Sequence, residues 1–288
     1  MRMRLSASQV VARDNCARMH WYQSVAKIKP RFVSANFVFG RSLDRATRDY
    51  LIAIATGASL PDPVATFKSL WQRERQSTPI VYAATQTPEV FERMGSDLLR
   101  QLPGAWDQTG FQVALDHESR PLIDVRLSME LGSMHGVELA YDGVIDVMVY
   151  DRDGDLGVVD VKSSQASHTE LYTRRSDQLT SYQMLIDANA ELLGLPRLQK
   201  LGFWDFLKRK NSSVIEAPVM VARRSPLDIS EYREKVFWMA DDIRRRRFPK
   251  SSRMQFNTPC ELCDFSKHCV DGDEEDLLFP SKDERASA

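Results

Sequence analysis

The stretch from residue 143 to residue 162, GVIDVMVYDRDGDLGVVDVK, constrains the fold more than any other part of this 288-residue sequence. Residues 143–150 and 156–162 are rich in β-branched and apolar side chains, which favour strands. The polar segment 151–155 separates them and contains Gly154, which readily adopts a positive φ. The pattern therefore predicts two strands joined by a tight turn.

Charged side chains interrupt both expected strands. Asp146 lies within the first, and Asp160 and Lys162 lie within the second. Because side chains alternate along a strand, Asp160 and Lys162 share one face and Val161 takes the other. Charges inside apolar strands are costly unless they are paired or bind a metal. The residues therefore indicate a divalent-cation site with oxygen ligands. A structural ion pair between Lys162 and an aspartate is the alternative.

Composition sets broad limits on the protein. Apolar residues make up 43% and charged residues 27% of the chain, with a net charge of −1, as in an ordinary globular protein. Any surface for nucleic acid must therefore be local. No stretch has the apolar length of a membrane span, and the N-terminal MRMRLSASQVV lacks the apolar region of a secretory signal. We expect a cytoplasmic protein without membrane contact.

The four cysteines have an informative spacing. Cys260, Cys263 and Cys269 form a Cys-x2-Cys-x5-Cys group, and Cys16 lies far away in the sequence. In a reducing compartment a compact cysteine group is more often a metal site than a disulfide framework. Four thiolates suit either tetrahedral zinc or an iron–sulfur cluster, and the spacing alone does not decide between them. Chance spacing is the remaining alternative.

Apolar periodicity predicts the other elements. Helices are expected over residues 5–27, 37–57, 66–75, 88–101, 176–193 and 230–247. Further strands are expected over residues 110–117, 123–131 and 202–207. The Pro103-Gly104 pair is expected to end the fourth helix, and the acidic residues 271–288 to form a flexible tail. This order of elements favours a single α/β domain with helical additions at both ends.

Three motifs in the central region resemble a known family. They are GxxD (Gly143, Asp146), DxK (Asp160, Val161, Lys162) and QxxxY (Gln178, Tyr182). In this order they resemble the RecB-type branch of the PD-(D/E)XK nuclease superfamily. An N-terminal Cys joined to a C-terminal CxxCx5C group resembles its iron–sulfur members, which include the exonuclease of CRISPR adaptation modules and the nuclease domain of AddB-type recombination helicases. The resemblance spans about residues 5–270.

The resemblance implies a fold and a division of the chain. The expected fold is α/β, with a restriction-endonuclease-like core in which helices flank a central mixed β-sheet. Residues 1–270 would form one nuclease domain. Within it, residues 1–35 and 248–270 would form a subdomain in which a metal cluster joins the N- and C-terminal segments. Residues 271–288 would follow as the acidic tail.

The resemblance also assigns roles to the charged residues. Mg²⁺ or Mn²⁺ would be held by Asp44, Asp146, Asp160 and the carbonyl of Val161. Lys162 would orient or deprotonate the attacking water, or stabilise the phosphate. Many family members have a His four residues after a Gly, where this chain has Gly40 and Asp44. A carboxylate also ligates a hard divalent ion, so the departure puts metal preference and metal number in doubt.

The remaining site residues would bind nucleic acid or the cluster. Gln178 and Tyr182 would line the nucleic-acid channel and complete the catalytic set, and Arg174 and Arg175 would contact phosphates. A structural [4Fe-4S] cluster, with zinc as the less favoured occupant, would be bound by Cys16, Cys260, Cys263 and Cys269.

The function implied is that of a metal-dependent DNA exonuclease acting on single strands or duplex ends. Its setting would be recombination, repair or CRISPR-type DNA processing, with partner proteins from recombination or CRISPR adaptation, in a bacterium or a phage. The departure at Asp44 keeps open a catalytically impaired protein that binds DNA ends or assembles recombination complexes. A zinc-stapled endonuclease is the third alternative.

Overall fold

The structure is a computed structural model that describes residues 2–84, 86–134, 136–251 and 259–281. The chain divides into two compact units. We call the first the terminal unit, which contains residues 1–32, 129–142 and 230–288, and the second the central unit, which contains residues 33–128 and 143–229. Strands β6 (Ile123–Met134) and β7 (Val137–Tyr150) contribute residues to both units.

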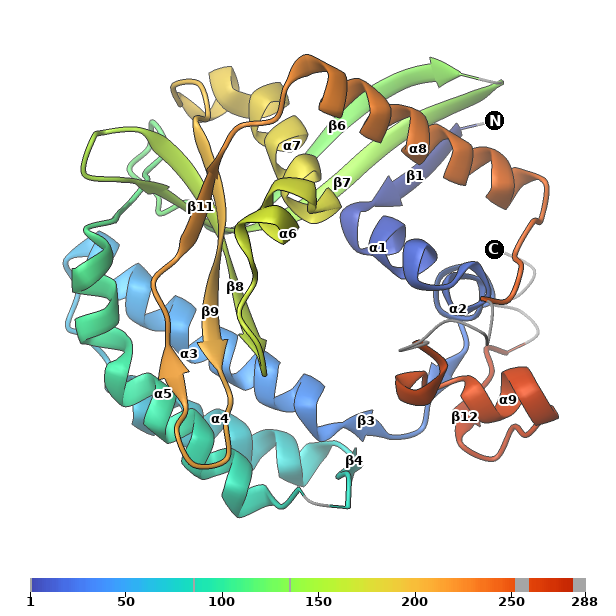
Figure 1. Cartoon of the computed structure of the whole chain (residues 1–288), viewed down its shortest axis with the longest axis horizontal. Helices are drawn as coiled ribbons and strands as arrows, with labels where there is room; N and C mark the ends of the chain where they lie inside the picture. The colour runs from blue at the N-terminus through green and yellow to red at the C-terminus, as the bar shows by residue number, and fades with distance from the viewer. Residues whose placement is uncertain (1, 85, 135, 252–258, 282–288) are drawn as a thin grey trace. The chain divides into compact units, whose positions relative to one another are not determined.

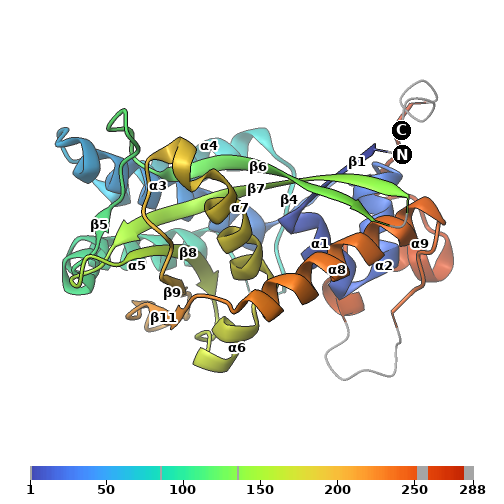
Figure 2. The same cartoon turned by 90° about the horizontal axis from the view of Figure 1, so that it is seen from above.

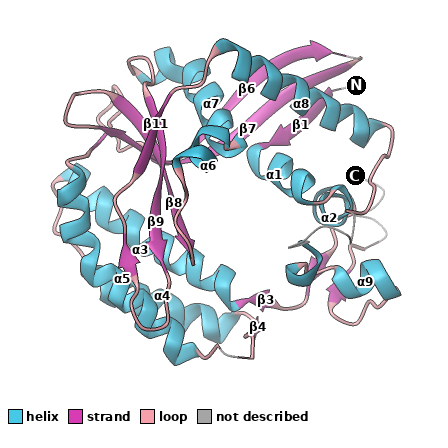
Figure 3. Ribbon diagram, in the orientation of Figure 1, coloured by secondary structure: helices cyan, strands magenta, loops and turns pink. Residues whose placement is uncertain are grey.

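A mixed β-sheet forms the middle of the central unit (Figure 3). The second part of β7 pairs with β8 (Leu156–Ser164) in antiparallel fashion, and β8 pairs in parallel with β9 (Lys200–Leu207). Short strands extend this sheet: β5 (Gln112–Val113) on β7, and β10 (Val214–Ile215) and β11 (Val219–Ala222) on β9. The expected mixed sheet is confirmed.

The hairpin between β7 and β8 forms as the sequence predicts. Gly154 has φ +81° in the connecting turn, a conformation that strongly favours glycine. Asp151 Oδ1 accepts hydrogen bonds from the backbone N–H groups of Asp153 and Asp155, both at 3.0 Å. Lys200 forms ion pairs with the acids of the turn. The acids of this turn therefore have a structural role.

Three helices cover one face of the sheet: α3 (Ala35–Thr56), α4 (Pro63–Ser77) and α5 (Pro88–Thr109). Their large buried side chains pack with Val147, Val159 and Trp204 of the sheet in one apolar core. Figures 1 and 2 show these helices on one side of β8 and β9, with α6 (Glu170–Arg175) and α7 (Asp177–Leu193) on the other. Helices therefore flank the sheet on both faces.

Gly143 has no side chain, which lets α7 pack closely on the sheet. A Cβ atom at Gly143 would lie 2.5 Å from Cδ1 of Leu185, which is fully buried in α7. Ser176 caps the helix by accepting a hydrogen bond from the backbone N–H of Leu179, and Gly194 ends it in the left-handed conformation. The first residue of the GxxD motif thus sets the distance between helix and strand.

The terminal unit combines both ends of the chain. Strand β1 (Arg2–Ser6) pairs in parallel with residues 138–142 of β7. Helices α1 (Ala7–Asn15) and α2 (Ala17–His20) and a π-helix (Trp21–Val25) follow. Strand β2 (Lys29–Pro30) pairs with β12 (Leu277–Leu278) in antiparallel fashion. The unit also contains most of α8 (Pro226–Arg244), a 3-10 helix (Pro259–Leu262) and α9 (Ser266–Asp271).

Strands β3 (Val33–Ser34) and β4 (Ile80–Val81) form a parallel pair in the central unit. Among the described residues, no helix has the combination of length and apolar character that crossing a membrane requires.

Four sequence expectations differ from the structure. The helix expected over residues 5–27 begins only at Ala7, because residues 2–6 form a strand on β7, and it breaks at Cys16, which has an extended backbone. The helix expected to end before Pro103 continues to Thr109 as α5. Buried Leu98, Leu102 and Trp106 lie on both sides of the proline, so packing outweighs the lost hydrogen bond.

The other two differences concern the acidic tail and one strand. Leu277, expected within a flexible segment, is buried with Tyr22, Ile28 and Phe265 in an apolar cluster of the terminal unit. The strand expected over residues 110–117 is reduced to β5. Residues 252–258 of the expected cluster subdomain and residues 282–288 of the expected tail lie outside the described residues.

Candidate active site

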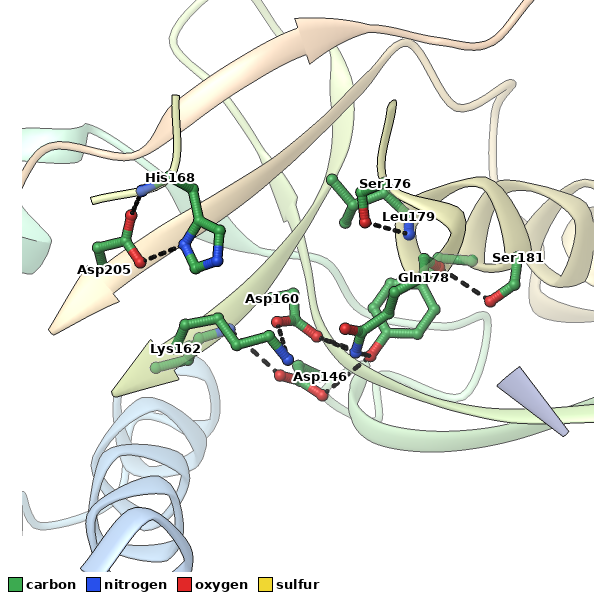
Figure 4. A network of polar contacts seen from close by, with 11 residues as sticks. Asp146, Asp160, Lys162, His168, Ser176, Gln178, Leu179, Ser181 and Asp205 are labelled. Atoms are coloured by element: carbon green, nitrogen blue, oxygen red, sulfur yellow. Dashed lines mark hydrogen bonds and ion pairs between the residues drawn. The ribbon is translucent and has the colours of Figure 1, made fainter. Parts of the chain in front are cut away.

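Two strands and a helix of the central unit place five motif residues at one site (Figure 4). Strand β7 carries Asp146, β8 carries Asp160 and Lys162, and α7 carries Gln178 and Tyr182. Hydrogen bonds and an ion pair connect these side chains. The structure therefore brings together residues that come from all three motifs.

Asp160 is at the centre of this network, and its side chain is 0% exposed. Its Oδ1 accepts hydrogen bonds from Nε2 of Gln178 at 2.6 Å and from the hydroxyl of Tyr182 at 2.9 Å. Gln178 Nε2 also donates to the Tyr182 oxygen at 3.0 Å. Because residues four apart lie on one face of a helix, α7 presents both donors to the same carboxylate.

The second oxygen of Asp160 has a different environment. Nζ of Lys162 lies 2.6 Å from Oδ2 and forms an ion pair with it. This contact lacks hydrogen-bond geometry, and Oδ2 is a buried oxygen without a hydrogen-bond partner among the described residues. A buried polar atom in this state is unusual and often marks a site for an ion or a reactant. The Lys162 side chain remains 34% exposed.

Asp146 adds a second buried carboxylate. Its Oδ2 accepts a hydrogen bond from the backbone N–H of Val161 at 3.2 Å, and its Oδ1 lies 3.3 Å from the hydroxyl of Tyr182. Burial raises the pKa of Asp146 well above its ordinary value, the charge of Asp160 raises it further, and Lys162 opposes both. The folded protein therefore maintains two close acids at an energetic cost.

The charges of these acids also act on their neighbours. Burial alone lowers the pKa of Lys162, but the carboxylates of Asp160 and Asp146 outweigh it, so the net pKa is raised. Burial raises the pKa of Tyr182 well above its ordinary value, and the same two acids add to the effect. Lys162 is therefore an ammonium at neutral pH, and Tyr182 is a neutral donor.

A cavity of about 10 Å³ adjoins the acids. Its walls include Asp44 of α3, Asp146 of β7 and Val161 of β8. Burial raises the pKa of Asp44, Arg48 opposes this, and the charges of Asp124 and Asp160 add to it. Such a cavity has room for about one water-sized particle. Asp44 therefore belongs to the same electrostatic cluster as the two strand acids.

The donor set fits a hard divalent cation. Carboxylate oxygens from three aspartates and one carbonyl are the ligands that Mg²⁺ and Mn²⁺ prefer, and Oδ2 of Asp160 is a buried acceptor that still lacks a hydrogen bond. Within the described ranges, however, no three His, Cys, Asp or Glu side chains are positioned to hold a metal ion as they stand. Cation binding would therefore require the acids to draw closer together.

Sequence reasoning missed four charged or titratable residues near this site. Asp124 lines the small cavity and forms an ion pair with Arg48, which follows Asp44 by one turn of α3. Asp205 of β9, opposite Lys162 in the strand register, binds His168. The signal for Asp205 was present, since it is an acid inside an apolar strand like Asp146.

The arginines predicted to contact phosphates lie at the end of α6. Arg174 and Arg175 are both exposed, and Arg174 forms an ion pair with Glu170 one turn earlier. Arginines in the last turn of a helix are also favoured by the helix dipole. Both side chains are accessible from solvent.

The four cysteines lie around one cavity of about 30 Å³ in the terminal unit. Cys16 lies in the break between α1 and α2, and the other three belong to the 3-10 helix, the turn after it and α9. All four are half-buried. The fold therefore brings Cys16 to the C-terminal triplet, although no three cysteines are positioned for a single metal ion as they stand in the described residues.

The thiols of this cavity differ in acidity. Burial raises the pKa of Cys263, and negative charge on Cys16, Asp264 and Cys260 adds to the rise. Burial acts in the same direction on Cys16, but hydrogen bonds from Ser251 and nearby backbone groups outweigh it, so its pKa is lowered. Thiolates in close proximity form the donor set of zinc and iron–sulfur sites.

Comparison with known proteins identifies the family. Residues 4–270 match the PD-(D/E)XK nuclease superfamily, and the chain belongs to this superfamily. No curated protein matches the chain. A nuclease superfamily is consistent with the mixed sheet and the acidic site described above.

Two solved structures are similar to the chain at low sequence identity. A candidate exonuclease from Eubacterium rectale is 11% identical with a TM-score of 0.49, over 98% of this chain and 92% of that one. An alkaline exonuclease from Laribacter hongkongensis is 13% identical with a TM-score of 0.28, over 78% of this chain and 92% of that one.

Proposed function

We propose that the protein is a metal-dependent DNA exonuclease that hydrolyses phosphodiester bonds in single strands or at duplex ends. The observation that carries the proposal is the convergence of Asp146 and Asp160 from neighbouring strands, with the Lys162 ammonium 2.6 Å from Asp160. Membership of the PD-(D/E)XK nuclease superfamily supports nucleic acid as the substrate.

The proposed mechanism assigns separate tasks to the site residues. A divalent cation, held by Asp44, Asp146, Asp160 and the Val161 carbonyl, would supply charge neutralisation and a more acidic water. The Lys162 ammonium orients the attacking water and stabilises the negative charge that develops on the phosphate. Its raised pKa favours this role over that of a general base.

The helix residues act by holding the acids in place. Gln178 and Tyr182 both donate to Oδ1 of Asp160, which leaves Oδ2 directed to the other groups of the site. Both side chains were expected to line a nucleic-acid channel. Since Tyr182 is only 2% exposed, we propose that it holds Asp160 in position and does not line the DNA channel.

A cleavage assay tests the proposed activity. End-labelled linear DNA and a covalently closed circle of the same sequence are incubated with Mn²⁺ and wild-type protein, Asp160→Asn or Asp153→Asn. Asp153 is the matched control, because it lies in the turn of the same hairpin and is 81% exposed. We expect wild type and Asp153→Asn to degrade linear DNA only, and Asp160→Asn to lose the activity. Equal degradation by all three proteins would contradict the site.

The circular substrate separates exonuclease from endonuclease. Cutting of closed circles by the wild type would favour the zinc-stapled endonuclease instead. Degradation confined to linear DNA would favour the exonuclease. Polarity follows from comparing substrates labelled at the 5′ end and at the 3′ end.

We further propose that Cys16, Cys260, Cys263 and Cys269 bind a structural [4Fe-4S] cluster. Their arrangement around one half-buried cavity supports a shared ligand, and zinc is the alternative occupant. Such a ligand would tie together segments about 240 residues apart in the sequence and so restrict the unfolded chain. Its role would be stability rather than redox chemistry.

A second candidate is a protein that binds DNA ends without cleaving them. Two observations favour it: Asp44 stands where family members commonly have a His, and no three acids are positioned for an ion as they stand among the described residues. Such a protein would retain labelled DNA in a binding assay with Mn²⁺ and leave its length unchanged. A role with partners in recombination or CRISPR adaptation would fit either candidate.

A further inference from the structure

We propose that His168 is a further catalytic residue, the acid that protonates the leaving-group oxygen of the cleaved phosphodiester. The inference rests on the proposed nuclease function and deepens it. None of the three motifs contains His168, which lies between β8 and α6.

A buried carboxylate fixes the histidine at two points. Asp205 of β9 is 2% exposed. Its Oδ2 accepts a hydrogen bond from the backbone N–H of His168 at 2.7 Å, and its Oδ1 lies 2.6 Å from Nδ1 of the ring. The backbone bond alone would anchor the loop. The second bond additionally fixes the direction of the ring, as a carboxylate does for a catalytic imidazole.

The ring of His168 lies on the side of the site that carries Lys162. Strand register places Asp205 opposite Lys162. The His168 ring stacks on Phe203, with centroids 4.4 Å apart, and Nζ of Lys162 lies 6.0 Å over the same Phe203 ring. Figure 4 shows His168 and Lys162 on the same side of the acidic pair. The imidazole and the ammonium therefore both lie against the ring of Phe203.

One nitrogen of the ring is left for a substrate. Asp205 occupies Nδ1, so the proposed proton donor is the other ring nitrogen, Nε2. The side chain is 18% exposed, which keeps it accessible while Phe203 and Tyr172 hold it in place.

The proton transfer completes hydrolysis without an additional reactant. The oxygen of water forms a bond to phosphorus, and the bond from phosphorus to the leaving oxygen breaks. The electron pair of that bond stays on the leaving oxygen, which takes the proton from Nε2 of His168. The water gives up a proton to solvent, and solvent restores the proton on the imidazole.

Substrates with a sulfur leaving atom test this role directly. A thiolate is a much weaker base than an alkoxide and leaves without a proton. Oligonucleotides carry either oxygen or bridging sulfur at the terminal linkage, in the 3′ or the 5′ bridging position. Each substrate is incubated with wild type, His168→Gln, Asp205→Asn or the control His117→Gln. His117 is a suitable control because its side chain is 55% exposed. Thermal unfolding of each variant verifies its fold.

The expected result is selective rescue. His168→Gln should cleave the oxygen substrate about 10²- to 10⁴-fold more slowly than wild type, and one of the two sulfur substrates at nearly the wild-type rate. Asp205→Asn, which perturbs the positioning residue, should show a smaller loss with the same rescue. If His168→Gln does not fold, the same comparison is made with Asp205→Asn.

Two other results would overturn the inference in distinguishable ways. Equal losses on oxygen and sulfur substrates, or no loss on either, would assign His168 a structural role and leave the nuclease proposal standing. Failure of the wild type to cleave any substrate would remove both the nuclease proposal and the role of His168.

Discussion

Tyr182 and Asp160 share a buried hydrogen bond of 2.9 Å that connects helix α7 to strand β8. The tyrosine is 2% exposed and the aspartate 0% exposed, so water cannot replace this bond when it is lost. It joins the second and third sequence motifs into one structural group. The orientation of the acidic pair therefore depends on the position of α7.

Removal of the tyrosine hydroxyl should weaken both stability and activity. We expect Tyr182→Phe to lower the free energy of unfolding by about 1.5–3 kcal/mol, because the charged carboxylate of Asp160 loses the buried hydrogen bond that the Tyr182 hydroxyl donates. DNA cleavage should fall about 10- to 100-fold as the acid loses its fixed orientation. Urea denaturation and the end-labelled assay measure the two effects. Tyr150→Phe, on β7, is the control, and an equal change in both variants would contradict this role.

The acidic pair predicts a pH-dependent stability difference. Because the pKa of Asp146 in the folded protein is raised above its ordinary 3.8, folding favours the protonated form. This contribution is fully present below pH 3.8 and is lost as the pH rises through the raised pKa. The Asn side chain of Asp146→Asn does not titrate, so the variant does not lose this contribution. The free energy of unfolding of the variant minus that of wild type should therefore increase as the pH rises from 3.8 through the raised pKa of Asp146. Denaturation at a series of pH values measures the difference, and a constant difference would contradict it.

The close packing of α7 predicts the effect of a single methyl group. Gly143→Ala would place Cβ 2.5 Å from Leu185, and we expect a cost of about 1–3 kcal/mol in unfolding free energy with reduced cleavage. Gly104→Ala is the control, because its Cβ would meet no atom within 4 Å inside α5. That variant should be as stable as wild type or more stable by about 0.5–1 kcal/mol. Similar behaviour of the two variants would be evidence against close packing at Gly143.

The cysteine cavity predicts a bound cofactor. Protein purified without oxygen should contain about four irons per chain and show visible absorbance if a [4Fe-4S] cluster is present. Cys263→Ala should lose the iron and much of the soluble protein together, whereas Ser266→Ala, in the same cavity, should keep both. If metal analysis finds zinc alone, a zinc site would replace the iron–sulfur proposal. A metal-free protein of unchanged stability would contradict both the iron–sulfur and the zinc proposal.

Local patterns in the sequence were sufficient for much of the central unit. Two apolar runs and the turn with Gly154 predicted the β7–β8 hairpin, and alternation along the strand correctly placed Asp160 and Lys162 on one face. The four-residue spacing of Gln178 and Tyr182 correctly placed both on one side of α7. These features depend on periodicity, which local sequence encodes directly.

Features that depend on distant partners were not predictable in this way. The first helix was expected to begin at residue 5, but pairing with β7 makes residues 2–6 a strand. Pro103 is compatible with α5 because the surrounding apolar residues are buried. The pairing of Asp205 with His168 depends on the register of β9 beside β8, which no local pattern specifies. Tertiary packing decided each of these cases.

Binding of Mn²⁺ tests the central claim most directly, because it reports on the acidic pair without requiring a DNA substrate. The loss of the free Mn²⁺ signal in electron paramagnetic resonance is measured for wild type, the double variant Asp146→Asn/Asp160→Asn and the control Asp153→Asn/Asp155→Asn. We expect wild type and the control to bind the ion at neutral pH, and the Asp146/Asp160 variant not to bind it. Equal binding by all three proteins would contradict the assignment of these aspartates as cation ligands.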